Sequence, residues 1–243
     1  MKKINIKGPI IDSQTGEFMS LFGADSYAYP SRLAKELTEA NGEDIVLEIN
    51  SPGGYTSSGA EMYTALKEYS GKVEAHVVGE ADSAGSLIAM SADKVLMSPM
   101  ALMMIHRASG GNQGTATDMN STAQALNELD QNIVNVYVAK TGKSESDIYD
   151  LMQKTTWMNA KTAIQEGFAD GLMEFNDKNS NESNAPAFVN AAVPIPHLQD
   201  NMLEEFKQFM QSRQKTNDVN KTTEDNKKTE LINHKLGLLF GGI

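Results

Sequence analysis

The four histidines are the first residues to examine for chemistry, because imidazole exchanges a proton near neutral pH. His197 and His234 lie in low-complexity sequence, where a base could hardly be held in place. His76 lies inside an apolar strand pattern and is interpreted as a satisfied core or edge histidine. His106 follows the apolar run Ala101–Ile105 and precedes a glycine-rich loop. Enzymes with α/β folds place reactive groups at such strand ends, so His106 is the candidate general base.

Ser83 is the candidate nucleophile. It lies in Gly79-Glu-Ala-Asp-Ser-Ala-Gly-Ser86, where small residues join a strand to an apolar helix. A serine on such a turn can expose its hydroxyl near a helix N-terminus. The stretch is not a Gly-x-Ser-x-Gly motif, since Ala81 stands at the first glycine position. A serine that only caps the helix is the alternative, and this turn alone leaves it open.

A glycine pair in Asn50-Ser-Pro-Gly-Gly54 could supply backbone donors to such a site. Adjacent glycines after a strand let N–H groups point at a developing oxyanion or at a phosphate. An ordinary strand-to-helix turn is the alternative. A nucleotide site is not indicated: Gly142-Lys-Ser144 resembles the end of a P-loop, but Tyr137 stands where that motif needs its first glycine.

Composition excludes several classes of function. The 243 residues are 40% hydrophobic and 22% charged, as in an ordinary soluble globular protein. A net charge of −11 without a basic patch argues against nucleic-acid partners. The absence of cysteine removes disulfides, thiolate chemistry and cysteine-based zinc sites, and we expect neither metal nor cofactor. No apolar run reaches signal-peptide or membrane-spanning length, so a cytoplasmic protein without a membrane partner is predicted.

Strand and helix patterns alternate along the chain and predict an α/β fold with a largely parallel sheet. Short strands are expected at Ile4–Ile6, Ile45–Ile49 and Val73–Val78, with a buried segment at Ala101–Ile105. Helices are expected from Pro30 and over Ala60–Tyr69, then a turn and helix across Gly79–Met90, a long helix Thr115–Lys140, and short helices Ser146–Gln153 and Ala160–Glu166.

Composition shifts sharply near residue 176, where Asn, Ser, Asp and Lys become dominant. We therefore expect a catalytic domain over residues 1–175 and a linker over residues 176–197. A tail over residues 198–243 is expected to carry one amphipathic helix, around Met202–Met210, and to be otherwise disordered.

Together these patterns resemble the proteolytic subunit of the Clp protease (peptidase S14), from about Asp44 to Leu172. In chain order, the resembling motifs are Ile49–Gly54, Ala81–Ser86, Met104–His106, Gly110–Gly114, Trp157–Ala160 and Glu166–Asp170. Within that family the chain looks most like the Clp-like head maturation proteases of tailed phages. That narrower likeness rests on the Lys7-Gly-Pro-Ile opening, a shortened segment between Ser83 and His106, and the Asn-rich tail.

The resemblance implies a spiral of ββα units with a protruding long helix. It also implies a serine endopeptidase in which Ser83 attacks the peptide carbonyl and His106 moves the proton. The oxyanion hole would be formed by the N–H groups of Gly54 and Ala84. The peptide substrate would lie as an added strand between two flanking segments, which contain the substrate-flanking residues Gly53, Tyr55, Arg107 and Gly110.

One residue departs from the family pattern at the third position of the catalytic triad. Counted from His106, the family's aspartate falls on Thr155, which carries no charge to stabilise an imidazolium. Asp150 is a nearby acid. Gln153 and Lys154 replace the charged pair that the family uses between stacked rings. The resemblance otherwise implies a homo-oligomeric heptameric ring acting on peptides or proteins, with a separate ATPase unfoldase or capsid proteins as partners.

Two alternatives remain. One is a catalytically weak or inactive ring-forming assembly protein, which Thr155 favours. The other is a crotonase-like acyl-CoA enzyme, since that superfamily shares the ββα architecture. The pairing of Ser83 with His106, and the lack of a basic stretch for a CoA phosphate, weigh against it.

Overall fold

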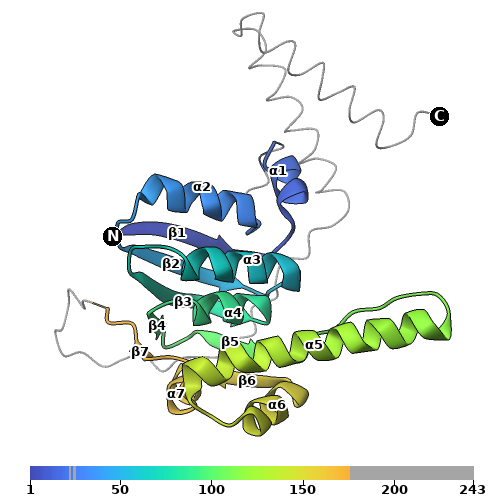
Figure 1. The fold of residues 1–243 in the computed structure, drawn as a ribbon. Coiled ribbons are helices and arrows are strands. Elements are labelled where there is room, and N and C mark those ends of the chain that lie inside the picture. Colours follow the sequence, from blue (N-terminus) through green and yellow to red (C-terminus); the bar gives the residue numbers. More distant parts are fainter. Residues whose placement is uncertain (22, 24–25, 176–243) are drawn as a thin grey trace, which may run out of the picture. The chain divides into compact units, whose positions relative to one another are not determined.

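The computed structural model describes residues 1–21, 23 and 26–175 (Figure 1). The expected linker, the expected tail with its helix, and His197 and His234 all lie outside the described residues. Within the described residues, no helix has both the length and the apolar character needed to span a membrane.

A seven-stranded sheet forms the centre of the described fold. Its path runs β1-β2-β3-β4-β7, and β5 branches from β3 to pair with β6. Every pairing is parallel except the antiparallel pair of β5 with β6. The strands are β1 Lys2–Lys7, β2 Ile45–Ser51, β3 Val73–Asp82, β4 Lys94–Met97, β5 Leu102–Ile105, β6 Thr156–Asn159 and β7 Gly171–Leu172. The predicted α/β fold with a largely parallel sheet is confirmed.

Seven helices accompany this sheet in the described part of the chain. They are α1 Ser13–Leu21, α2 Pro30–Ala40, α3 Thr56–Lys67, α4 Ala84–Met90, α5 Ala116–Thr141, α6 Glu145–Gln153 and α7 Ala160–Gln165. Figure 1 shows α2, α3 and α4 in a row along one face of the sheet. Helix α5 extends far beyond the sheet, as expected for a protruding long helix. Its buried residues lie in its second half, at Asp130, Ile133, Val134 and Tyr137.

Local sequence explains the ends of the predicted helices. Helix α2 begins at Pro30, whose fixed φ suits the first helical position, and Asn41 ends it in the left-handed region at φ 50°. Helix α5 begins with a capping box in which Thr115 and Asp118 exchange hydrogen bonds. Core-facing Leu33 and Leu37 of α2 are buried, in agreement with the predicted apolar face.

The structure corrects the prediction around Gly79. A turn was expected from this residue, but strand β3 continues to Asp82, because Glu80–Asp82 pair with Leu102–Met104 of β5. The turn is therefore reduced to Ser83, directly before α4. Helix α3 also begins at Thr56, four residues before the expected Ala60.

Candidate active site

Ser83 occupies a strained turn between β3 and α4. Its backbone has φ 52° and ψ −122°, a conformation that non-glycine residues rarely adopt, and its N–H donates to the Met104 carbonyl at 2.8 Å. The Ser83 side chain makes no capping hydrogen bond, although the residue stands at the N-cap of α4. The interpretation of Ser83 as a mere helix cap is therefore wrong, and its hydroxyl is available for another partner.

That partner is His106. The pairing of Asp82 with Met104 brings the end of β3 beside the end of β5, where His106 directly follows Ile105. His106 Nε2 lies 2.7 Å from Ser83 Oγ, and both residues are half-buried. This is hydrogen-bonding distance for a nucleophile and its base. Residues 23 positions apart in the sequence thus form one pair.

The loop after β2 packs directly against the Ser83 turn and requires its two glycines. Gly53 has φ 88°, and a Cβ there would lie 2.6 Å from the Asp82 carbonyl oxygen and 2.8 Å from Ser83 Cβ. A Cβ on Gly54 would lie 2.0 Å from the Ile10 carbonyl oxygen. Both contacts are too short for any side chain, so glycine is needed for the loop to approach the serine.

Two residues with uncommitted backbone N–H groups line the same small cavity as the Ser83–His106 pair. Gly54, Ala84, Ser83 and His106 line this cavity of about 60 Å³, and Arg107 lines it as well. Within the described residues, neither the Gly54 nor the Ala84 N–H has a hydrogen-bond acceptor. Uncommitted amides beside a nucleophile can stabilise a developing oxyanion.

Two linked hydrogen bonds, from Tyr137 to Ser86 and from Ser86 to Ser83, support the backbone of the nucleophile. Ser86 Oγ donates to the Ser83 carbonyl at 2.6 Å and lies 2.7 Å from Tyr137 Oη, so the tyrosine hydroxyl donates to Ser86. Burial raises the pKa of Tyr137, which keeps this donor protonated. The sequence did not predict this series of hydrogen bonds, because Ser86 and Tyr137 lie 51 positions apart.

Thr155 lies opposite His106, and no hydrogen bond joins the two side chains within the described part of the chain. The antiparallel pairing of Ile105 with Thr156 puts Thr155 opposite His106 in register, at φ 52° and exposed. The neighbouring Thr156 hydroxyl donates to the Leu151 carbonyl at 2.7 Å. Among the described residues, the His106 ring forms no ion pair with a carboxylate, and Asp150 is exposed.

The remaining predicted residues do not line the cavity that contains Ser83 and His106. Tyr55 is 58% exposed beside the loop glycines, and Gly110 is exposed; neither lines the cavity. His76 Nε2 lies 2.6 Å from Glu74 Oε1, in agreement with its interpretation as a satisfied histidine. Within the described ranges, no group of three or more His, Cys, Asp or Glu side chains could hold a metal ion.

A buried carboxyl lies immediately before the nucleophile. Asp82 is 3% exposed, and its Oδ1 has no hydrogen-bond partner among the described residues. Burial raises the pKa of Asp82 to about 6, and the neighbouring charge of Glu80 adds to the effect. The Ser83 turn therefore rests on a residue that destabilises the fold when ionised.

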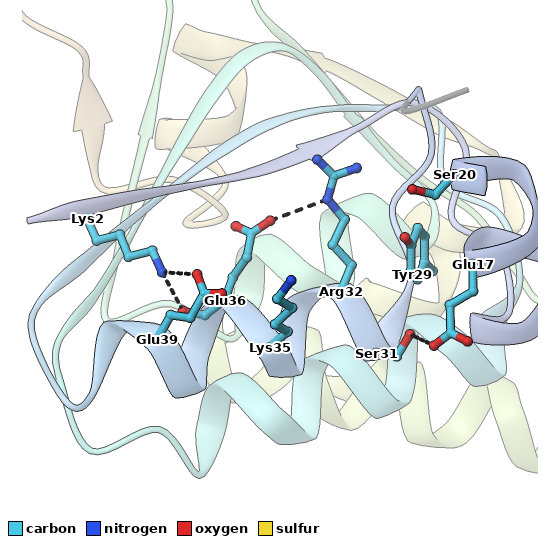
Figure 2. Close-up of a pocket in the computed structure, with 9 residues that line it drawn as sticks. All are labelled: Lys2, Glu17, Ser20, Tyr29, Ser31, Arg32, Lys35, Glu36 and Glu39. Atoms are coloured by element: carbon cyan, nitrogen blue, oxygen red, sulfur yellow. Dashed lines mark hydrogen bonds and ion pairs between the residues drawn. The ribbon is translucent and has the colours of Figure 1, made fainter. Parts of the chain in front are cut away.

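A larger cavity of about 470 Å³ lies away from this site, over α2 and beside α1 and β1 (Figure 2). Most of its charged side chains bind one another: Lys2 Nζ lies 3.1 Å from Glu39 and Arg32 Nε 3.3 Å from Glu36. Ser31 donates to Glu17 at 2.7 Å. The cavity contains no histidine to activate its serines, so the smaller cavity at Ser83 is the better candidate for chemistry.

Comparison with known proteins gives a family match and two relatives. A sequence profile described as Clp protease matches residues 32–176, more than half of the chain. The ATP-dependent Clp protease proteolytic subunit 1 of Chlamydia muridarum is 36% identical over 147 residues, covering 58% of this chain and 76% of that protein. The subunit of the same name from Chlamydia trachomatis serovar D is 35% identical over the same coverage.

Proposed function

Since this chain belongs to the Clp protease family, we propose that it hydrolyses peptide bonds through an acyl-enzyme formed on Ser83. The observation that carries the proposal is the 2.7 Å distance between Ser83 Oγ and His106 Nε2. The family is one of serine peptidases, so its membership favours this activity over the acyl-CoA chemistry of a crotonase.

In the acylation half of the reaction, neutral His106 accepts the Ser83 hydroxyl proton on Nε2 while Oγ attacks the peptide carbonyl carbon. The carbonyl oxygen becomes an oxyanion and accepts hydrogen bonds from the amides of Gly54 and Ala84, two residues that line the same cavity. The C–N bond then breaks, and His106 returns the proton to the leaving amine. An ester between Ser83 and the acyl half of the substrate remains.

Deacylation repeats these steps with water. His106 removes a proton from the attacking water, and the same two amides hold the second oxyanion. The ester bond to Ser83 breaks, His106 gives the proton back to Oγ, and a carboxylic acid leaves. The two halves together consume one water and restore the Ser83–His106 pair.

The substrate in this proposal is an extended peptide. It lies as an added strand between the segment Gly53–Tyr55 and the segment Arg107–Gly114. Arg107 lines the cavity, which supports contact with the substrate.

The assembly and the partners are further parts of the proposal, supported by family membership. We propose a heptameric ring in the cytoplasm, fed by a separate ATPase, because the sequence contains no nucleotide motif. A role in phage head maturation, on capsid proteins, rests on the narrower resemblance alone. Mass photometry at micromolar concentration tests the ring, and a uniformly monomeric protein would contradict it.

A second candidate is a ring-forming assembly protein with little or no peptidase activity. Its supporting observation is the His106 ring, which has no carboxylate partner among the described residues. Loss of that carboxylate from a triad lowers turnover by about 10⁴ at neutral pH.

Hydrolysis of a small fluorogenic peptide separates the two candidates. The proposal expects slow but measurable turnover that Ser83→Ala abolishes and that Ser121→Ala, on the exposed surface of α5, leaves unchanged. A wild-type protein that assembles but shows no turnover would favour the assembly protein. Turnover that survives Ser83→Ala would contradict the proposed nucleophile.

A further inference from the structure

A buried carboxylate on α5 holds the two residues that follow His106. Asp130 is only 2% exposed. Its Oδ2 accepts a hydrogen bond from Arg107 Nε at 2.6 Å, and its Oδ1 accepts one from the Ala108 backbone N–H at 2.7 Å. A carboxylate is costly to bury unless its oxygens are bonded in this way. The contact therefore fixes both a side chain and a stretch of backbone.

The Arg107 guanidinium is held from other sides as well. Its Nη2 donates to Asn127 Oδ1 at 3.2 Å, also on α5. Its Cζ lies 5.2 Å from the ring centroid of Tyr149, on α6. The hydrogen bonds to Asp130 and Asn127 of α5, together with the contact with Tyr149 of α6, leave the guanidinium little freedom to move.

This anchor lies next to the catalytic pair in the chain and in space. Arg107, Ala108 and Ser109 line the cavity that contains Ser83 and His106. The His106 ring itself is hydrogen-bonded only to Ser83 within the described residues. Since no carboxylate of the described residues bonds to the ring, the direction in which the backbone leaves β5 has more influence on where the imidazole points.

We infer that Asp130 is a positioning residue for His106 and for the cavity wall at residues 107–109, acting through Arg107 and the Ala108 amide. The inference rests on the proposed peptidase function and adds a residue that the triad pattern does not contain. Asp130 touches neither substrate nor the reacting atoms. Its effect on the reaction is to hold the base in line with Ser83 Oγ, where a misplacement of about 1 Å costs about 100-fold in rate.

A purely structural role is the rival explanation. In that case the Asp130–Arg107 pair only ties α5 to the end of β5, and its loss lowers the melting temperature or the folded fraction. The rate per folded molecule would then stay at the wild-type value. A positioning role predicts instead that folded molecules react more slowly.

The decisive variant is Asp130→Asn, because asparagine keeps an oxygen for the Ala108 N–H while it removes the charge that binds Arg107. The measurement is the second-order rate of labelling by a fluorophosphonate probe, per folded molecule as judged by circular dichroism. We expect a decrease of about 10- to 100-fold. Glu128→Gln is the matched control, since it removes one charge from an exposed position of the same helix, and it should label within twofold of wild type.

Two results separate a failure of this inference from a failure of the proposed function. Wild-type labelling that depends on Ser83, with folded Asp130→Asn labelled equally fast, would overturn the positioning role alone. Absence of Ser83-dependent labelling in the wild type would overturn the peptidase proposal, and the inference with it.

Arg107→Gln gives an independent test if Asp130→Asn does not fold, because the Arg107 side chain is 37% exposed and its loss is better tolerated. It should slow labelling to a similar extent. Where both variants fold, the double variant should label no more slowly than the slower single one, because both remove the same contact. A wild-type rate in Arg107→Gln, or losses that multiply in the double variant, would overturn the inference.

Discussion

The two halves of the candidate site are built differently. Ser83 is fixed by its immediate surroundings: Gly53 packs against it, Met104 binds its N–H and Ser86 binds its carbonyl. Among the described residues the His106 ring has one hydrogen bond, to Ser83, and the two residues that follow it are anchored to α5. The nucleophile is thus preorganised, whereas the base is held indirectly. We therefore expect the rate to depend most on how well His106 is aligned.

Removing either member of the pair should give the largest effect. Ser83→Ala and His106→Ala should each abolish measurable turnover of a fluorogenic peptide, because neither member of the pair works without the other. For the same reason, the double variant should be no slower than either single variant. Substantial turnover in His106→Ala would show that the indirectly held half does not act as the base.

Supplying the missing acid should have the next largest effect, in the opposite direction. Thr155→Asp should raise turnover by at least about 10-fold and by up to about 10⁴, because a carboxylate there could orient and charge-stabilise His106. The backbone at φ 52° favours the change, since aspartate tolerates the left-handed region better than a β-branched threonine.

Asp150→Asn is the matched test of the rival acid. Asp150 is exposed, so we expect its replacement to leave peptide turnover unchanged. A large loss of turnover in Asp150→Asn, together with unchanged turnover in Thr155→Asp, would contradict this. It would mean that α6 shifts to bring the Asp150 carboxylate to His106, so that the base is held directly.

Weakening the support of the nucleophile should have a moderate effect. Tyr137→Phe removes one hydrogen bond from the chain below Ser83, and we expect a loss of about 1 kcal/mol in the free energy of unfolding. Labelling by a fluorophosphonate should slow only a few-fold, because Ser86 still binds the Ser83 carbonyl. Ser86→Ala should slow it further. Equal rates in the wild type and in Ser86→Ala would show that the turn needs no such support.

The smallest expected effect concerns stability and pH. The pKa of Asp82 is raised to about 6 in the fold, so the folded state binds this proton more tightly than the unfolded chain does. Its contribution to stability is therefore greatest at low pH and is lost as pH rises through 6. Asp82→Asn should raise Tm at pH 8 by about 2–4 °C and flatten the dependence of Tm between pH 4 and 7. Exposed Asp150→Asn should leave that slope unchanged.

Local patterns in the sequence predicted most of the fold. Pro30, the strand at Ile45 and the long helix through Tyr137 lie where expected, because each depends on nearby residues. The missed strands β4, β6 and β7 have four residues or fewer, too short for a periodic signal. The end of β3 was missed because pairing with β5 overrides the turn preference of Gly79-Glu-Ala-Asp.

The candidate site shows the same limit: residues with a local pattern were predicted, and contacts between distant residues were not. Ser83 and His106 were identified separately, from a turn and a strand end, and the structure brings them together. Asp130 gave no signal, since a polar residue on a long helix usually faces solvent, and no pattern connected Tyr137 with Ser86. Their roles depend on which turn of α5 meets the end of β5, and this is set by tertiary packing.

Mapping the adduct of a fluorophosphonate probe tests the central claim most directly, because only an activated serine reacts. The wild-type chain, labelled at neutral pH and digested for mass spectrometry, should carry one adduct, on Ser83. His106→Ala should carry none in the same time. An unmodified wild-type protein, or an adduct on Ser51 or Ser86, would contradict the assignment of Ser83 and His106 as the reacting pair.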